Sequence, residues 1–117
     1  MHEMGIALQI IDIATAAIPP ERQPCQVEKV HLKIGKLSAV VVSSLTFCLE
    51  IATRETPLEK AAISIEEVPV VARCRECGHE WQIEQAVFTC PACASGSLAI
   101  ISGRELEVTS IEIEEAE

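Results

Sequence analysis

The chain has 117 residues, of which 49% are hydrophobic but only 3% are aromatic. It is long enough for one small domain or two lobes, and too short for a large enclosed catalytic cavity. The composition predicts a folded chain with a core of Ile, Val, Leu and Ala. The formal net charge of −9 disfavours nonspecific nucleic-acid binding, because a polyanion would be repelled.

The first segment does not resemble a signal peptide, although residues 4–18 are largely apolar. Glu3 stands where a signal peptide has a basic residue, and Gln9 and Asp12 interrupt the apolar run. No other segment is long enough to cross a bilayer. We therefore expect a cytoplasmic protein without a membrane partner. In that compartment thiols stay reduced, so clustered cysteines indicate metal or redox chemistry.

Two helices are predicted in the first half of the chain. Apolar residues at intervals of three and four predict a helix over residues 4–18, ended by Pro19, with a stripe of Met4, Leu8, Ile11, Ala14 and Ile18. Ser38 is the predicted N-cap of the second helix, which Pro57 closes. The apolar face of the second helix comprises Val41, Leu45, Cys48, Leu49 and Ala52.

Alternating apolar residues predict strands over residues 30–34, 62–70 and 104–114. In the last of these the apolar parity switches near Ser110, which indicates a bulge. The expected fold is α+β, with two helices packed on a three-stranded sheet and an inserted zinc-ribbon-like lobe. The predicted division is an α/β lobe of residues 1–70 plus 102–117 and a metal-binding lobe of residues 71–101.

The inserted stretch carries two CxxC pairs, formed by Cys74 with Cys77 and by Cys90 with Cys93, and twelve residues separate the pairs. Each pair directs two sulfurs inward from a tight turn. Gly78, directly after the first pair, reduces the backbone strain of that turn. Four thiolates complete a closed tetrahedral site, so a structural Zn²⁺ is predicted. A redox dithiol and an iron-sulfur cluster are the alternatives.

The remaining cysteines, the tryptophan and two of the histidines are not expected to bind metal. Cys25 and Cys48 are expected to be isolated thiols, and Trp81 is expected to pack across the hairpin between the cysteine pairs. His79 could compete for the metal, but an exposed turn histidine is the preferred interpretation. His31, on a strand whose alternate residues are apolar, is expected to face solvent.

The amino terminus offers a second candidate metal site. The Met1 amine, the His2 amide nitrogen and the His2 imidazole can chelate Ni²⁺ or Cu²⁺ in a square plane. The fourth position is left to the Glu3 amide or carboxylate, to water or to another side chain. By itself this signal is weak, since any protein can begin with Met-His.

The whole chain resembles the HypA/HybF family of hydrogenase nickel-incorporation proteins. The resemblance rests on motifs in the order MHEMGIA, VHLKIGKLSAV, SLTFCLE, AAISIEEVP, CRECG, CPAC and ELEVTSIEIEE. It implies a metallochaperone, not an enzyme, that delivers Ni(II) to the large-subunit precursor of nickel-iron hydrogenase together with the GTPase HypB. Urease maturation proteins remain open as further partners.

The resemblance also implies which residues bind each metal. The family's ligands for nickel, its exchangeable cargo, correspond to Met1, His2 and Glu3. Its ligands for structural zinc correspond to Cys74, Cys77, Cys90 and Cys93. Glu3 is also implicated in the family's contact with the GTPase. Some relatives carry a second histidine just after the second cysteine pair, where this chain has Ala94 and Ser95. A histidine-for-cysteine ligand exchange is therefore not expected.

Two functions of other classes compete with this interpretation. Zinc ribbons are common in nucleic-acid and transcription adaptors, but Arg73 and Arg75 are offset by three glutamates at positions 76, 80 and 84, which leaves no basic stripe. A thiol redox sensor would use the same cysteines without bound zinc. A low-salt electrophoretic shift assay tests the first alternative, and a zinc-to-protein ratio tests the second.

Overall fold

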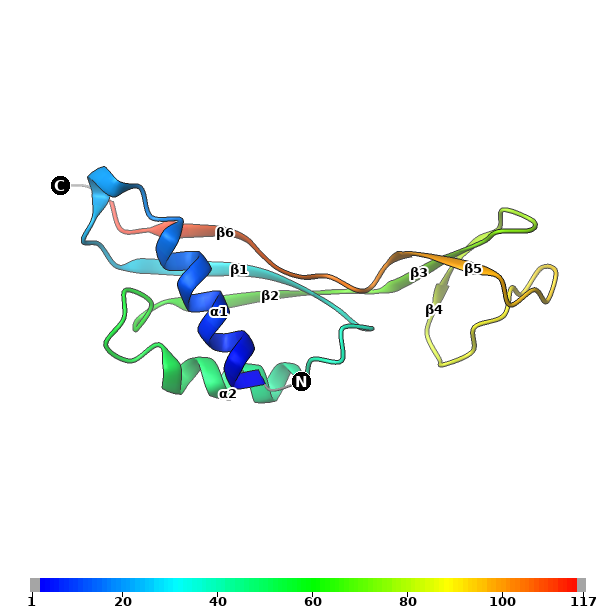
Figure 1. The fold of residues 1–117 in the computed structure, drawn as a ribbon, viewed down its shortest axis with the longest axis horizontal. Coiled ribbons are helices and arrows are strands. Elements are labelled where there is room, and N and C mark those ends of the chain that lie inside the picture. The colour runs from blue at the N-terminus through cyan, green and yellow to red at the C-terminus, as the bar shows by residue number, and fades with distance from the viewer. Residues whose placement is uncertain (1–2, 116–117) are drawn as a thin grey trace.

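Two small sheets placed end to end organise the molecule (Figure 1). The structure is a computed structural model, and it describes residues 3–115. In chain order the elements are α1 (Glu3–Ala16), the short 3-10 helix η1 (Pro20–Arg22), β1 (Val27–Gly35), α2 (Val42–Ala52), β2 (Ala62–Val68), β3 (Val70–Cys74), β4 (Glu80–Ile83), β5 (Leu98–Ser102) and β6 (Leu106–Ile113).

The first sheet has the strand order β2-β1-β6, with β2 parallel and β6 antiparallel to β1. Alternate residues of β1 join both helices in one buried core, whose main members are Ile6, Ala7, Ile10, Ile11, Ala14, Val30, Leu32, Ile34, Leu45 and Leu49. Because these β1 residues share one parity, both helices pack on the same face of the sheet. The predicted α+β class and its three-stranded sheet are confirmed.

The predicted apolar stripe of the first helix is wrong at its start. Met4 is 37% exposed and Leu8 is 51% exposed, whereas Ile6 and Ile10 are buried. Nearly every second position in this helix is apolar, so the spacing alone fits more than one face. Contact with both the sheet and α2 selects the face that contains Ile6, Ala7 and Ile10.

The predicted start of the second helix is also wrong. Helix α2 begins at Val42, and the Ser38 hydroxyl accepts a bond from the Val40 amide in the preceding turn instead of capping the helix. The helix ends at Ala52, where Thr53 donates its hydroxyl proton to the Leu49 carbonyl at 2.7 Å. The helix thus ends before Pro57 is reached.

The second sheet has the order β4-β3-β5 and was not predicted as a sheet. The predicted strand over residues 62–70 divides at Pro69, beyond which the chain continues as β3. The expected bulge in the last strand is confirmed, since β1 pairs His31 with Ser110 but Leu32 with Val108. Two residues of β6 therefore lie opposite one residue of β1, so the apolar residues before and after the bulge all lie on the core side of the sheet.

The junction between the sheets is tightly packed. The Ser102 hydroxyl donates to the Pro69 carbonyl at 2.9 Å, and the Leu37 amide donates to the Gly103 carbonyl at 2.7 Å. The molecule measures 59 × 26 × 16 Å, and its radius of gyration of 18.0 Å exceeds the value of about 13 Å expected for a compact chain of this length. The two sheets therefore form an elongated molecule with a narrow middle.

Substitution of Gly35 by alanine is expected to distort this junction. A Cβ atom there would lie 2.0 Å from the Gly103 carbonyl oxygen, so the backbone must shift, at a cost of about 1–3 kcal/mol. The matched control is Gly5→Ala, because a Cβ at Gly5 meets nothing within 4 Å and alanine favours the helix by up to about 1 kcal/mol. Chemical denaturation measures both changes; equal stability of the two variants would contradict the packing described here.

Candidate metal centre

Four cysteines converge at the far end of the second sheet. Cys74 is the last residue of β3 and Cys77 lies in the turn before β4, while Cys90 and Cys93 lie in the loop that leads to β5. Cys74 and Cys90 are buried, and Cys77 and Cys93 are exposed. We refer to these four residues as the four-cysteine centre. Its ligands come from two loops that the sheet holds face to face.

The two cysteine turns have the same backbone hydrogen bonds. The amide of Cys74 donates to the carbonyl of His79, and the amide of Cys90 donates to that of Ser95, both at 2.8 Å. Four residues after each first cysteine, the amides of Gly78 and Ala94 donate back to the carbonyls of Cys74 and Cys90. Each turn thus fixes its two sulfurs by the same geometry, as expected of paired zinc knuckles.

The sulfur positions suit a tetrahedral zinc ion. All four Sγ atoms lie within 4.8 Å of one another, with 3.5 Å between Cys74 and Cys93 and 3.6 Å between Cys77 and Cys90. Four thiolates at the usual zinc–sulfur bond length of about 2.3 Å would stand about 3.8 Å apart. Small adjustments would therefore place a Zn²⁺ ion at equal distance from the four sulfurs.

The environment of the sulfurs favours a cation in the centre. A hydrogen bond from the backbone amide of Cys77 outweighs the effect of burial and, with weaker hydrogen bonds from Glu76 and Cys93, lowers the pKa of Cys74 to about 6. A backbone hydrogen bond from Ser95 lowers the pKa of Cys93, but the neighbouring thiol of Cys74, burial and the other two thiols raise it to about 12. Four thiolates this close cannot all carry charge unless a cation balances them.

Replacement of Ala94 by glycine is expected to stabilise the second cysteine turn. Gly78 and Ala94 hold equivalent positions with φ of 79° and 63°, and alanine adopts this left-handed conformation at a cost of about 1 kcal/mol. The melting temperature of the zinc-loaded protein should rise in Ala94→Gly. Ala92→Gly, two residues earlier in the same turn, is the control; a melting temperature that rises equally in the control would show that the left-handed conformation is not the cause.

The other candidate residues stand outside the four-cysteine centre. His79 is exposed, as predicted, and its ring stacks on Trp81 at 5.7 Å between centroids, a contact that the sequence did not predict. Cys25 is buried in the core of the α/β part and Cys48 is half-buried beside it. His31 is partly exposed and pairs with Glu112 at 2.6 Å, which lowers the pKa of that carboxyl.

Of the predicted nickel ligands, Met1 and His2 lie outside the described residues. Glu3 begins α1, and its carboxylate faces the start of α2, where it accepts long hydrogen bonds of 3.5 Å from the Val41 amide and the Ser44 hydroxyl. Val41 occupies the N-cap position but has no side-chain oxygen. Glu3 therefore caps the second helix from the first, where the helix dipole favours a negative charge.

Comparison with known proteins identifies the family. A family model described as hydrogenase/urease nickel incorporation, metallochaperone, HypA matches residues 1–113. The chain belongs to the HypA family. The hydrogenase maturation factor HypA of Desulfosudis oleivorans is 56% identical to it, and the match covers 98% of this chain and 100% of the relative. The hydrogenase maturation factor HypA of Desulfatibacillum aliphaticivorans is 54% identical, and the match covers 100% of this chain and 90% of the relative.

A HypA structure confirms the fold. The solution structure of the Ni metallochaperone HypA from Helicobacter pylori matches with a TM-score of 0.68 at 24% identity, over 97% of both chains. As a HypA family member, the chain is a nickel metallochaperone of hydrogenase maturation, and its four-cysteine centre suits a structural zinc. No helix within residues 3–115 has the length and apolar content needed to cross a membrane.

Proposed function

We propose that the chain carries Ni²⁺ at its first residues and donates it to the large-subunit precursor of nickel-iron hydrogenase. The observation that carries this proposal is that the match to a nickel-incorporation family begins at residue 1 and so includes the Met-His-Glu terminus. The Met1 amine, the His2 amide and the His2 imidazole supply three nitrogen ligands, a set that suits square-planar Ni²⁺.

The proposal assigns the two halves different tasks. Residues 1–70 plus 102–117 present the nickel site, and residues 71–101 hold a structural zinc at the four-cysteine centre. The Glu3 carboxylate, the one proposed nickel-site residue that the structure describes, contacts the start of α2. Nickel is held by ligands of a single short segment of the chain, so a partner's ligands can replace those of the carrier one at a time.

The partners and the cellular setting follow from the same proposal. The GTPase HypB assists the transfer in the cytoplasm, and Glu3 contributes to the contact with it. The chain acts as a carrier and not as an enzyme, since the proposed steps are ligand exchanges that leave no covalent product. Urease maturation proteins are a second client to test by nickel transfer to the purified proteins.

A metal titration of the untagged protein tests the proposal. We expect one tightly bound zinc per chain, which a chelator removes slowly, and one weaker nickel that binds without displacing zinc. Elemental analysis after each addition reports both ratios. Nickel that binds only when zinc leaves would assign both metals to the four-cysteine centre and would contradict the separate terminal site.

An extension ahead of Met1 is expected to weaken nickel binding by at least about tenfold, because an amide replaces the terminal amine as a ligand. Two versions of the protein that differ only in a short cleavable leader are compared by calorimetry with Ni²⁺. The same leader placed after residue 117 is the control and should leave nickel affinity unchanged. Equal nickel affinity of the leader-bearing and untagged proteins would show that the terminal amine is not a ligand.

A further inference from the structure

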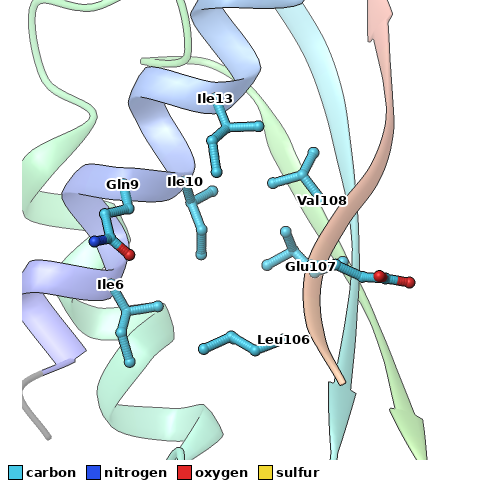
Figure 2. Close-up of a pocket in the computed structure, with 8 residues that line it drawn as sticks. Ile6, Gln9, Ile10, Ile13, Leu106, Glu107 and Val108 are labelled. Carbon is cyan, nitrogen blue, oxygen red and sulfur yellow. The ribbon is translucent and has the colours of Figure 1, made fainter. Parts of the chain in front are cut away.

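An apolar groove separates α1 from β6 (Figure 2). Its cavity volume is about 70 Å³, and it is lined by Ile6, Gln9, Ile10, Ile13, Leu32, Leu106, Glu107 and Val108. Ile13 is 54% exposed and Leu106 is 38% exposed, so apolar surface on both sides of the groove meets solvent. The Glu107 carboxylate points away from the groove toward the other face of the sheet (Figure 2).

The backbone beside the groove is an open sheet edge. Strand β6 is the outer strand of its sheet, and no strand within residues 3–115 pairs with its far side. The Glu105 carbonyl accepts the Gly35 amide at 2.7 Å, which directs the backbone groups of Glu105 toward β1. Hydrogen-bonding direction alternates along an antiparallel strand, so the amides and carbonyls of Leu106 and Val108 point outward. These groups can pair with an added strand.

The negative charge of β6 restricts which strand of another protein can pair with it. Residues 105–115 carry five carboxylates and no lysine or arginine. A second copy of the chain that paired through β6 would place these carboxylates against one another, which is unfavourable. On the inner side of β6, Lys33 and Lys29 of β1 already lie opposite Glu107 and Glu112. A strand added on the outer side would favour apolar side chains toward the groove and basic side chains toward these two glutamates.

We propose that β6 and the groove accept an extended segment of a partner protein as a fourth strand. The segment alternates apolar residues with lysine or arginine. Its backbone bonds to Leu106 and Val108, its apolar side chains cover Ile13 and Leu106, and its basic side chains meet Glu107 on the opposite face. Backbone pairing supplies affinity, and the alternating side chains supply selectivity.

This surface lies close to the start of the chain. Ile6, in the groove wall, is three residues from Glu3, which corresponds to about 5 Å along a helix. A segment bound on β6 therefore holds its own protein near the N-terminal end of α1. The docking proposal itself does not depend on nickel, because none of the groove residues belongs to the proposed nickel site.

The test uses zinc-loaded full-length protein and a capped seven-residue peptide of alternating valine and lysine. We expect binding in an NMR titration with peptide up to about 1 mM, and slower hydrogen exchange at the Leu106 and Val108 amides. Ile13→Glu should weaken binding by at least about tenfold, because it places a carboxylate in the apolar groove. Leu8→Glu is the matched control, on the same helix but outside the groove, and should bind like the parent.

Four outcomes would overturn the docking proposal. They are no spectral change at the highest peptide concentration, binding that leaves the Leu106 and Val108 amides unprotected, equal binding of a valine–glutamate peptide, and self-association that protects the same amides without peptide. The second outcome would indicate a docked helix, and the last a second copy of the chain. A His2→Gln protein that binds the peptide normally but not nickel would show that docking on β6 is independent of the proposed nickel site.

Discussion

Replacement of Cys74 by serine is expected to release zinc and unfold the second sheet. Cys74 ends β3, is only 1% exposed, and donates its amide to His79 within the first cysteine turn. A lobe of about thirty residues buries too little apolar surface to fold without its metal. Structural zinc sites supply roughly 10–16 kcal/mol of apparent binding free energy, so the loss of one ligand should remove most of the lobe's stability.

Elemental analysis and amide exchange measure this loss directly. The zinc-to-protein ratio should fall well below one, and amides of β3, β4 and β5 should lose protection while those of β1 and α1 keep theirs. Cys48→Ser is the matched control, because that half-buried thiol lies on α2 outside the four-cysteine centre. If Cys74→Ser kept stoichiometric zinc and melted like the parent, the structural role of zinc would have to be abandoned.

Replacement of His2 by alanine is expected to abolish nickel binding and to leave zinc and fold intact. The imidazole is the one side-chain nitrogen in the proposed terminal chelate, and its loss should lower nickel affinity by about a hundredfold or more. Calorimetric titration with Ni²⁺ measures the affinity, and a zinc analysis of the same sample reports on the four-cysteine centre.

Two further variants make the nickel result specific. A small second residue permits enzymatic removal of Met1, so His2→Gln is needed to remove the imidazole while the terminal methionine is retained. His79→Ala removes an exposed histidine that is outside the proposed terminal site, and this variant should bind nickel like the parent. Parent-like nickel affinity in His2→Gln would disprove the terminal assignment, whatever the alanine variant shows.

The general fold could be predicted because its signals are local. Alternation along β1 and the parity switch near Ser110 follow directly from which residues face the core, and the structure confirms both. The four-cysteine centre was equally predictable, since each CxxC turn fixes the direction of its own sulfurs. These features depend on neighbours a few residues apart in the chain.

Features that depend on distant contacts could not be predicted. Helix α2 has no N-cap oxygen of its own, and Glu3, which lies 38 residues before Val41, takes that role. The buried face of α1 is selected by its contacts with α2 and the sheet, so periodicity alone gave the wrong stripe. The left-handed backbone of Ala94 was missed for a different reason, because alanine gives no signal for a φ of 63°, unlike glycine at the equivalent position 78.

The hydrogen bond between Ser102 and Pro69 shows that the cysteine-rich segment leaves and rejoins the rest of the chain at a single point. A segment whose ends meet can be excised without pulling apart the strands on which it stands. Among the described residues, the buried core of α1, α2 and the first sheet contains no member of that segment. We therefore expect the first sheet and its two helices to keep their packing when the sequence of the cysteine-rich segment changes.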